Sequence, residues 1–451
     1  MSGLNSLFEL LERHPGRVFW CVGLAFATLY VSSHALFPRE GGRIINGDAI
    51  QYYAYLRSLV VDGDLDFQND YRLFYEPESD GSDGWATVPT TGRAANLMSV
   101  GPALLWAPLF LFVGVCSRAL GGPMDGMAAP FQLSAGVAGI LYGTAGLYLC
   151  YDICRQVFDA KSAFWATLTA WLATSALYYT LVSPAYSHSV SLFAVALFSH
   201  TWLRTRAREG LDRHVLLGAL GGLVALVRWQ DVIVLSLPLI ELCLAVARRE
   251  RSVVSATGRL AAMGLALLLV FIPQMVAWQV IYGEFLLTPQ GGGFMNWTNP
   301  AIGSVLFSLN HGLFTWTPVV VLAMIGLRWL ILRDAVVGWS ALAILAQALY
   351  INAAVSDWWA GEAFGARRFI GYTAFMALGL AAFFSGRFWK ARPALVRWSA
   401  TGLVVYNMLF FVQYQLFMRG LDELAPYPTT AREVFLDRLA IPWRLVRYWL
   451  G

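Results

Sequence analysis

An aspartate that follows the first long apolar run has the position and the chemistry of a general base. The apolar run covers residues 18–37, and the polar stretch after it contains GDAIQYYAYLRSLVV, in which Asp48 precedes a helical pattern of apolar residues up to Val61. A positioned carboxylate can accept the proton of a hydroxyl group as that group attacks a substrate. The same position also fits an N-cap, because Gly47 and Asp48 stand where a cap belongs.

Other residues suited to binding phosphate or sugar lie in short segments between apolar runs. Arginine can bind two phosphate oxygens at once through its fork of donors. Each of these residues also has a purely structural interpretation. A histidine at a helix end is often an interfacial residue whose hydrogen bonds are made within the protein. Arg228 and Asp231 fit an internal ion pair, and Trp358 and Trp359 fit membrane anchors. The predicted substrate-binding residues are Arg93, His188, Arg228, Asp231, His311, Glu362, Arg367 and Arg368.

Four aspartates, Asp62, Asp64, Asp66 and Asp70, follow the helical pattern in DGDLDFQND. Their spacing resembles the start of an EF-hand loop, but the glycine at the sixth position and the glutamate at the twelfth are missing. Solvated loop residues are therefore the preferred interpretation, and a calcium loop is the alternative. We predict no resident cofactor. A divalent metal ion is compatible with the chemistry but has no ligand motif to support it.

The elements that must position these residues are membrane helices. Of 451 residues, 58% are hydrophobic and 13% are charged, against about 25% charged in a typical soluble domain. The 18 tryptophans and 19 tyrosines suit the two membrane interfaces. A net charge of only +4 argues against a nucleic-acid partner. All five cysteines are predicted to be small core residues: Cys21, Cys116, Cys150, Cys154 and Cys243.

The arginines predict how the chain crosses the membrane. Basic connectors fall at every second connection from residue 152 onward, so all of them can face the cytoplasm together. Placing the N-terminus there as well requires that one early run does not cross, and we assign 97–116 as a re-entrant or interfacial helix because Pro102 and Pro108 interrupt it. Eleven crossings remain, with 18–37 as an uncleaved anchor. The twelve apolar runs are 18–37, 97–116, 129–151, 163–182, 189–203, 214–228, 232–247, 259–280, 313–332, 337–355, 368–386 and 396–417.

The sequence thus predicts one all-α domain over residues 1–451, a polytopic membrane protein whose chemistry gathers on the outer face. Residues 38–128 form a long first outer loop with interfacial helices, and 418–451 form an outer C-terminal tail. The tail carries five arginines, which argue against this orientation.

This layout resembles the class C glycosyltransferases, which use sugars carried on polyprenyl phosphate, and among them the bacterial protein O-mannosyltransferases and lipid A aminoarabinose transferases. In that family an essential aspartate opens the first outer loop before an amphipathic helix, and Asp48 in GDAIQYYAYLRSL matches it. NLMSVGPALLWAP resembles the proline-containing helix at the membrane edge. Two features depart from the family. Where the family has a pair of acidic residues, this chain has Asp48 followed by Ala49, and the lysine often found before the proline stretch is absent, with Arg93 the nearest base.

The resemblance implies an inverting glycosyltransferase on the outer face of the cytoplasmic membrane, with Asp48 as the base and a glycan, lipid or protein acceptor. One carboxylate suffices because the phosphate leaves already charged and arginines can stabilise it, whereas a glycosidase needs a second carboxyl group as acid. Two alternatives stay open. A lipid or sugar transporter or flippase would favour repeats and ionisable groups at mid-membrane. An O-antigen ligase-like transferase should rely on arginine and histidine without the aspartate.

Overall fold

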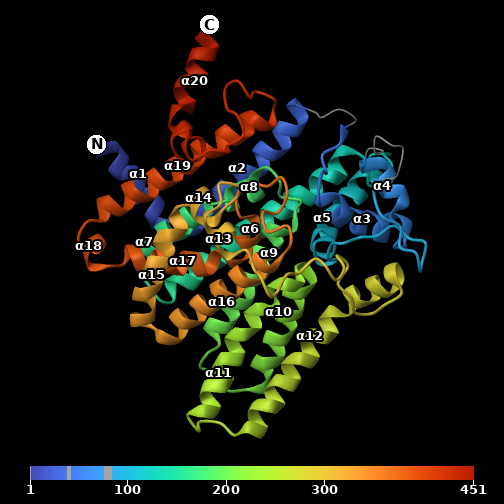
Figure 1. Ribbon diagram of the computed structural model, residues 1–451, viewed down its shortest axis with the longest axis horizontal. Coiled ribbons are helices and arrows are strands. Elements are labelled where there is room, and N and C mark those ends of the chain that lie inside the picture. Colours follow the sequence, from blue (N-terminus) through green and yellow to red (C-terminus); the bar gives the residue numbers. More distant parts are fainter. Residues whose placement is uncertain (1, 38–41, 76–83, 451) are drawn as a thin grey trace. The chain divides into compact units, whose positions relative to one another are not determined.

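A computed structural model describes residues 2–37, 42–75 and 84–450, whose regular structure is helical apart from two isolated β-bridges (Figure 1). The all-α class is confirmed. Residues 38–41 and 76–83 of the predicted outer loop lie outside the described residues. The chain divides into two compact units, which we describe separately. Unit 1 comprises Met1–Cys21, Leu147–Tyr179 and Phe294–Gly451, and unit 2 comprises Val22–Gly146 and Thr180–Gly293.

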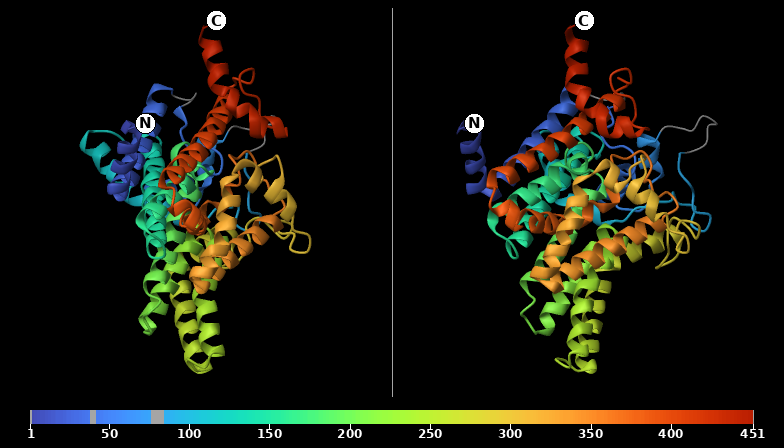
Figure 2. Two further views of the ribbon diagram at one scale, coloured as in Figure 1. Left: turned by 90° about the vertical axis from the view of Figure 1, so that its left-hand side faces the viewer. Right: turned by 60° about the vertical axis from the view of Figure 1, so that its left-hand side comes forward.

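Unit 2 contains the start of the predicted outer loop and a layer of long helices. Helices α10 and α12 run side by side, and α9 and α5 also pack on α10 (Figures 1 and 2). The helices of this unit are α3 (Ala49–Arg57), the π-helical turn η2 (Ser58–Asp62), α4 (Gln68–Phe74), α5 (Gly101–Ala119), α9 (Ser187–Arg204), α10 (Leu211–Val227), the 3-10 helix η3 (Trp229–Leu235), α11 (Ser236–Ala247) and α12 (Val253–Tyr282).

Unit 1 is built around the packing of α15 on α17 and of α17 and α19 on α7. An aromatic cluster fills its centre, where the fully buried Trp316 ring lies 4.7 Å from Phe410 and 5.8 Å from Phe364 between ring centroids. Its helices are α1 (Ser2–Arg13), α7 (Ala160–Leu172), α13 (Ile302–Phe307), α14 (Leu313–Trp316), α15 (Val319–Arg333), α16 (Ala335–Ala354), η4 (Arg367–Tyr372), α17 (Thr373–Phe384), α18 (Arg387–Lys390), α19 (Pro393–Met418), η5 (Glu433–Asp437) and α20 (Arg438–Leu450). Helices α2 (Pro15–Leu36), α6 (Ala129–Arg155) and α8 (Ala176–Leu181) contain residues of both units.

Seven helical segments in the described residues are long and apolar enough to cross a membrane. All seven coincide with predicted apolar runs, so the polytopic membrane class is confirmed. The count of eleven crossings stays a prediction. The seven segments are Pro15–Leu36, Gly101–Ala119, Ala129–Arg155, Trp229–Ala247, Val253–Tyr282, Ala335–Ala354 and Pro393–Met418.

From Gly101 on, the run at 97–116 belongs to one continuous helix, α5, rather than a helix interrupted by two prolines. Pro102 lies at the first turn of α5, where its missing N–H group would have no helical partner in any case. Only Pro108 lies inside the helix. The predicted interruption at Pro102 is therefore wrong, and the non-crossing assignment itself stays a prediction.

Two of the predicted core cysteines, Cys150 and Cys154, are buried, whereas Cys21, Cys116 and Cys243 are exposed. The prediction was wrong for these three because a cysteine on an apolar helix is buried only where another helix covers that face. In a membrane, lipid can cover such a face without protein contact.

Candidate active site

Asp48 is half-buried at the N-terminus of α3, immediately before Ala49. The predicted helix after Asp48 is confirmed, and Asp48 holds its N-cap position, but the predicted capping hydrogen bond of the side chain is not formed. The backbone of Asp48 is already helical, with φ −55° and ψ −26°.

The residues around Asp48 connect the start of α3 to the start of α9. Gly47 has a φ of +55°, and a Cβ atom at that position would lie 2.2 Å from the hydroxyl oxygen of Tyr186. One helical turn after Asp48, the Tyr52 hydroxyl donates to Ser187 Oγ at 2.8 Å. Glycine is therefore needed before Asp48 both for the backbone conformation and for the approach of Tyr186.

His188, Arg228 and Asp231 form a buried cluster beside this junction. Arg228 Nη1 lies 3.4 Å from His188 Nδ1, and Arg228 Nε lies 4.0 Å from Asp231 Oδ2. The predicted Arg228–Asp231 pair is confirmed. Because a guanidinium only donates, Nδ1 of His188 must accept, which places the proton of a neutral ring on Nε2. Ser191 donates to Asp231 at 2.5 Å, and the Tyr186 ring stacks on the His188 ring.

The side chain of Gln51 on α3 bonds to one side chain and one backbone group of the outer loop. The Tyr75 hydroxyl accepts from Gln51 Nε2 at 3.4 Å, and Gln51 Oε1 accepts from the backbone N–H of Leu97 at 2.8 Å. Burial raises the pKa of Tyr75, and the negative charge of Asp48 acts in the same direction. The segment that leads into α5 is therefore tied to the helix that Asp48 begins.

Arg93 lies in the turn between the bridged residues Thr87 and Ala94. This turn is anchored on the C-terminal end of α12, where the Thr91 hydroxyl donates to the carbonyl of Ile281 at 2.5 Å and the Asn96 N–H donates to Tyr282 Oη at 3.1 Å. The guanidinium of Arg93 is half-exposed and makes no side-chain hydrogen bond within residues 42–75 and 84–450. Its assignment to a lipid phosphate stays a prediction.

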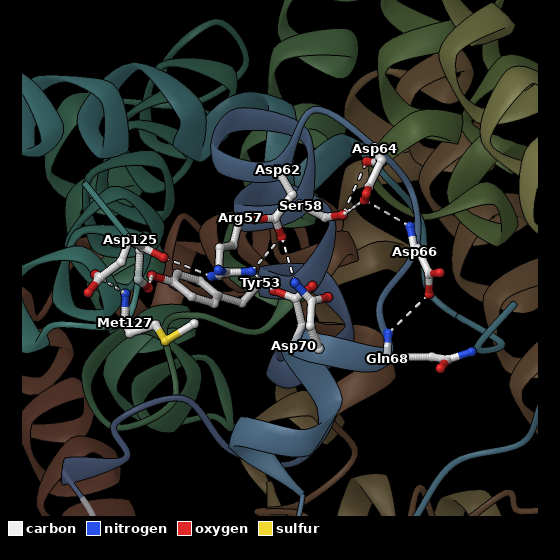
Figure 3. A network of polar contacts seen from close by, with 12 residues as sticks. Tyr53, Arg57, Ser58, Asp62, Asp64, Asp66, Gln68, Asp70, Asp125 and Met127 are labelled. Atoms are coloured by element: carbon white, nitrogen blue, oxygen red, sulfur yellow. Dashed lines mark hydrogen bonds and ion pairs between the residues drawn. The ribbon is translucent and has the colours of Figure 1, made fainter. Parts of the chain in front are cut away.

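Two of the four aspartates of DGDLDFQND, Asp62 and Asp70, pair with Arg57 (Figure 3). Arg57 Nη1 lies 2.6 Å from Asp62 Oδ2 and 2.9 Å from Asp70 Oδ1, and Nε donates to the carbonyl of Asp125 at 2.8 Å. Asp64 accepts from the Ser58 hydroxyl at 2.8 Å. The described residues contain no group of three or more His, Cys, Asp or Glu side chains that could hold a metal ion.

Three of the predicted residues of unit 1, His311, Arg367 and Arg368, line a small, partly open pocket. Arg368 donates to Asp357 Oδ1 at 2.7 Å and to its backbone carbonyl at 2.9 Å, so the charge of Arg368 is partly balanced. Aromatic rings and the amide of Asn352 complete the lining. The pocket is lined by Val305, His311, Asn352, Trp358, Trp359, Ala360, Ala366, Arg367, Arg368 and Phe369.

His311 holds the wall of this pocket together. Its Nδ1 lies 2.8 Å from the carbonyl oxygen of Trp359, and its Nε2 lies 2.8 Å from Tyr427 Oη. A carbonyl only accepts, so Nδ1 carries the proton and Nε2 accepts from the tyrosine. Burial lowers the pKa of His311 to about 4; the charge of Arg367 acts in the same direction, and the hydrogen bond to Trp359 opposes it. The ring is therefore neutral at pH 7.

Glu362 is exposed on the segment between Trp359 and η4. Its charge acts on Tyr427: burial raises the pKa of that phenol to about 12, and the carboxylate of Glu362 contributes to the rise. Glu362 thus lies near the tyrosine that bonds to His311.

The structure therefore brings the predicted residues together in two groups. Asp48, His188, Arg228 and Asp231 belong to unit 2, and His311, Glu362, Arg367 and Arg368 belong to unit 1. The sequence reasoning missed several residues of these groups. Helical spacing offered a signal for two of them, because Tyr52 follows Asp48 by four positions and Ser191 follows His188 by three. Tyr75, Tyr186 and Tyr427 approach from distant segments and had no local signal.

The fold of the chain is like that of a solved structure with the class C glycosyltransferase fold. The chain is similar to the crystal structure of ArnT, an aminoarabinose transferase, from Cupriavidus metallidurans in the apo state, with a TM-score of 0.52, 15% sequence identity, and coverage of 95% of this chain and 76% of that one. The structure of the same ArnT bound to undecaprenyl phosphate aligns with a TM-score of 0.49, at 14% identity and the same coverage. No protein-family model and no curated protein sequence matches the chain. The predicted fold resemblance is thus confirmed.

Proposed function

We propose that this membrane protein is a glycosyltransferase that moves one sugar from a polyprenyl-phosphate carrier to an acceptor on the outer face of the cytoplasmic membrane. The observation that carries the proposal is the ArnT fold, which extends over 95% of the chain. Within that fold, Asp48 begins the helix after the first apolar run, as the family resemblance requires, and its side chain is not used as a helix cap.

Asp48 would act as the general base. The acceptor hydroxyl loses its proton to the carboxylate while its oxygen attacks the anomeric carbon of the sugar. The bond between that carbon and the phosphate oxygen breaks on the opposite side, its electron pair leaves with the polyprenyl phosphate, and the anomeric configuration inverts. A base of this kind contributes roughly 10²–10⁴-fold in rate.

Arginines would stabilise the departing phosphate. Arg228, Arg367, Arg368 and Arg93 are the candidates, because guanidinium groups bind phosphate oxygens in pairs and a preorganised charge costs no reorganisation during the reaction. His188 would orient Arg228, since its Nδ1 accepts from that guanidinium. His311 would act by shaping the pocket wall, because both of its ring nitrogens are already bonded within the chain.

A reconstituted transfer assay tests the proposal. The purified protein in lipid nanodiscs is mixed with a polyprenyl phosphate that carries a labelled sugar and with an extract of envelope glycans and lipids. We expect the label to move onto an acceptor with release of an equal amount of polyprenyl phosphate. Transport of the intact donor across proteoliposomes, without cleavage of the sugar–phosphate bond, would instead identify a flippase.

A further inference from the structure

The first turns of the C-terminal helix α20 are covered on one face, where Arg438 and Ile441 are buried with Val434 of the preceding η5 and where α20 packs on α19. Among the described residues nothing covers the opposite face, and residues 446–450 are exposed all round. The uncovered residues recur at alternating spacings of three and four and therefore form one stripe along the opposite side of the helix. These residues and their exposed fractions are Leu436 (60%), Leu439 (56%), Trp443 (63%), Val446 (47%) and Leu450 (83%).

The contact of Arg438 with α19 sets the depth at which α20 begins. The guanidinium carbon of Arg438 lies 3.8 Å from the ring centre of Phe410 and 4.2 Å from that of Tyr406. Met418 is the last residue of α19. At a rise of 1.5 Å per residue, Phe410 lies about 12 Å and Tyr406 about 18 Å from that end of the helix. α19 has 26 residues and is one of the candidate spans. If it is centred in a hydrocarbon layer about 30 Å thick, Arg438 lies roughly 7–13 Å inside that layer.

Three backbone carbonyls of the turn before α20 are bonded at this depth, whereas Nε and Nη1 of Arg438 and Oε1 of Gln413 have no hydrogen-bond partner among the described residues. The carbonyl of Glu433 accepts from Gln413 Nε2 at 3.1 Å, and the carbonyl of Phe435 accepts from the Tyr406 hydroxyl at 3.0 Å. The carbonyl of Val434 accepts from Arg438 itself. In lipid an unsatisfied backbone group is costly, so these bonds suit a turn that enters the bilayer. The aromatic rings of Tyr406 and Phe410 compensate the buried charge of Arg438 through cation–π contacts.

The charged side chains next to the stripe are either paired within the chain or long enough to reach lipid headgroups. Asp437 pairs with Arg444 at 3.2 Å and with Arg432 at 3.4 Å, so the acid is neutralised. Arg447 lies over the Trp443 ring at 5.6 Å, a position from which a long side chain can reach the phosphates while its stem stays apolar. Trp449 is 81% exposed near the end of the helix, where an indole suits the interface.

We propose that α20 lies in one leaflet of the bilayer, with the stripe of Leu436, Leu439, Trp443, Val446 and Leu450 in contact with lipid. The predicted C-terminal tail is then a membrane-embedded helix rather than an aqueous segment. The bilayer is the partner that the depth of α19, the satisfied carbonyls and the adjacent arginines favour. A second copy of the chain is the alternative occupant that the test must exclude.

Fluorescence quenching in nanodiscs tests this placement. Single cysteines replace Leu439 or Trp443 in the full-length protein without its native cysteines, and each is labelled with an environment-sensitive fluorophore. Leu268, exposed on the candidate span α12, serves as the lipid control, and Glu209, exposed in a basic connector, serves as the aqueous control.

We expect nitroxide-labelled lipid to quench Leu439→Cys and Trp443→Cys to within about twofold of Leu268→Cys, and aqueous iodide to quench them several-fold less than Glu209→Cys. Iodide quenching equal to that of the aqueous control would overturn the proposal. So would protection from both quenchers together with efficient disulfide crosslinking between two copies of the unlabelled Leu439→Cys variant, because protein would then cover the stripe. Two probe positions guard against a local disturbance from either substitution.

Discussion

His311 is kept neutral chiefly by burial, which lowers its pKa, and this shift makes stability depend on pH. Its ring is 4% exposed, and its pKa in the folded protein is about 4 instead of 6.5. The unfolded chain therefore binds more protons than the folded one between these two pH values. The contribution of the neutral ring is fully present above pH 6.5 and is lost as the pH falls toward 4.

We expect the difference in thermal stability between the wild type and His311→Gln in nanodiscs, followed by tryptophan fluorescence, to change from pH 7 to pH 4.5 by about 3 kcal/mol at most, with the wild type losing stability relative to the variant. The variant keeps the contribution of Asp70, so the comparison isolates the ring of His311. His14→Gln, at an exposed position in the same unit, is the matched control and should keep the pH dependence of the wild type. An unaltered pH dependence in His311→Gln would show that the ring does not titrate in this way.

The pKa of Asp70 is shifted so that stability changes with pH in the direction opposite to that of His311. Burial raises its pKa to about 7, although Arg57 opposes the rise. We consider burial decisive because Arg57 Nη1 is shared with Asp62 and because Oδ2 of the fully buried Asp70 has no partner among the described residues. The folded protein then binds the extra proton between pH 3.8 and 7, and this contribution to stability is lost as the pH rises through 7.

Asp70→Asn, which resembles the protonated carboxyl group, should therefore be at least as stable as the wild type at pH 8. Its relative stability should decrease at pH 5. Thermal unfolding at the two pH values measures both. Asp62→Asn, at a partly exposed position, should cost only about 0–1 kcal/mol. A loss of about 3–5 kcal/mol for Asp70→Asn at pH 8 would instead indicate a fully ionised buried pair.

At the scale of residues, the sequence predicted which residues belong to the candidate site better than which side chains contact them. Asp48 was recognisable from its place after an apolar run, and Arg228 and Asp231 from their place between two such runs. Tyr186 near Gly47 and Tyr427 on His311 could not be predicted, because each contact joins segments far apart in the chain. Spacing along a helix carries no information about which distant loop returns to it.

Helix packing in unit 1 depends on glycines that let backbones meet. A Cβ atom on Gly326 of α15 would lie 1.9 Å from the carbonyl oxygen of Gly379 on α17, and one on Gly379 would lie 2.3 Å from the carbonyl of Ala323. Small residues at such crossings are typical of membrane helices, because close approach is what attracts the helices to each other.

We expect Gly326→Ala to destabilise the protein by about 1–3 kcal/mol, since neither backbone can move far enough to relieve the overlap. Thermal unfolding in nanodiscs, with retention by size-exclusion chromatography, measures the loss. Gly402→Ala in α19 is the control: no atom lies within 4 Å of its Cβ position, and alanine should be neutral or stabilising by up to about 1 kcal/mol. Equal effects of the two substitutions would contradict the packing argument.

At the scale of elements, apolar runs located the helices but not their breaks. The run at 163–182 divides into α7 and α8, and Asn407 explains the division: its Nδ2 donates to the carbonyls of Leu172 and Thr174 at 2.9 and 3.2 Å. These bonds satisfy carbonyls that the interrupted helix leaves free. The break depends on a side chain more than 230 positions away, so no local pattern could indicate it.

The distribution of arginines predicts which loops of the chain face the cytoplasm, and this membrane orientation can be tested. Ser356 and Glu209 are both exposed, and Ser356 lies beside the predicted site residue Asp357. In intact cells that express the protein without its native cysteines, Ser356→Cys should react with a membrane-impermeant maleimide. Glu209→Cys should react only after the cells are opened. Labelling of Glu209→Cys in intact cells would reverse the predicted orientation.

At the scale of the whole molecule, composition predicted the membrane class and the layout of loops predicted the ArnT-like fold. Both are properties of long stretches of chain, so they survive at 15% identity. Substrate specificity depends on smaller features, such as the lining of the pocket around Arg367 and Arg368. These features consist of a few side chains that are brought together only by folding.

The role of Asp48 as the base is the central claim, and one comparison tests it most directly. Sugar transfer from a labelled polyprenyl-phosphate donor is measured for the wild type and for Asp48→Asn, with donor binding and protein yield as controls. We predict unchanged yield and donor binding in Asp48→Asn, and a fall in turnover of about 10²–10⁴-fold, because the amide cannot accept the proton of the acceptor. Near-normal turnover of Asp48→Asn would contradict the claim and favour a ligase-like mechanism that relies on arginine and histidine.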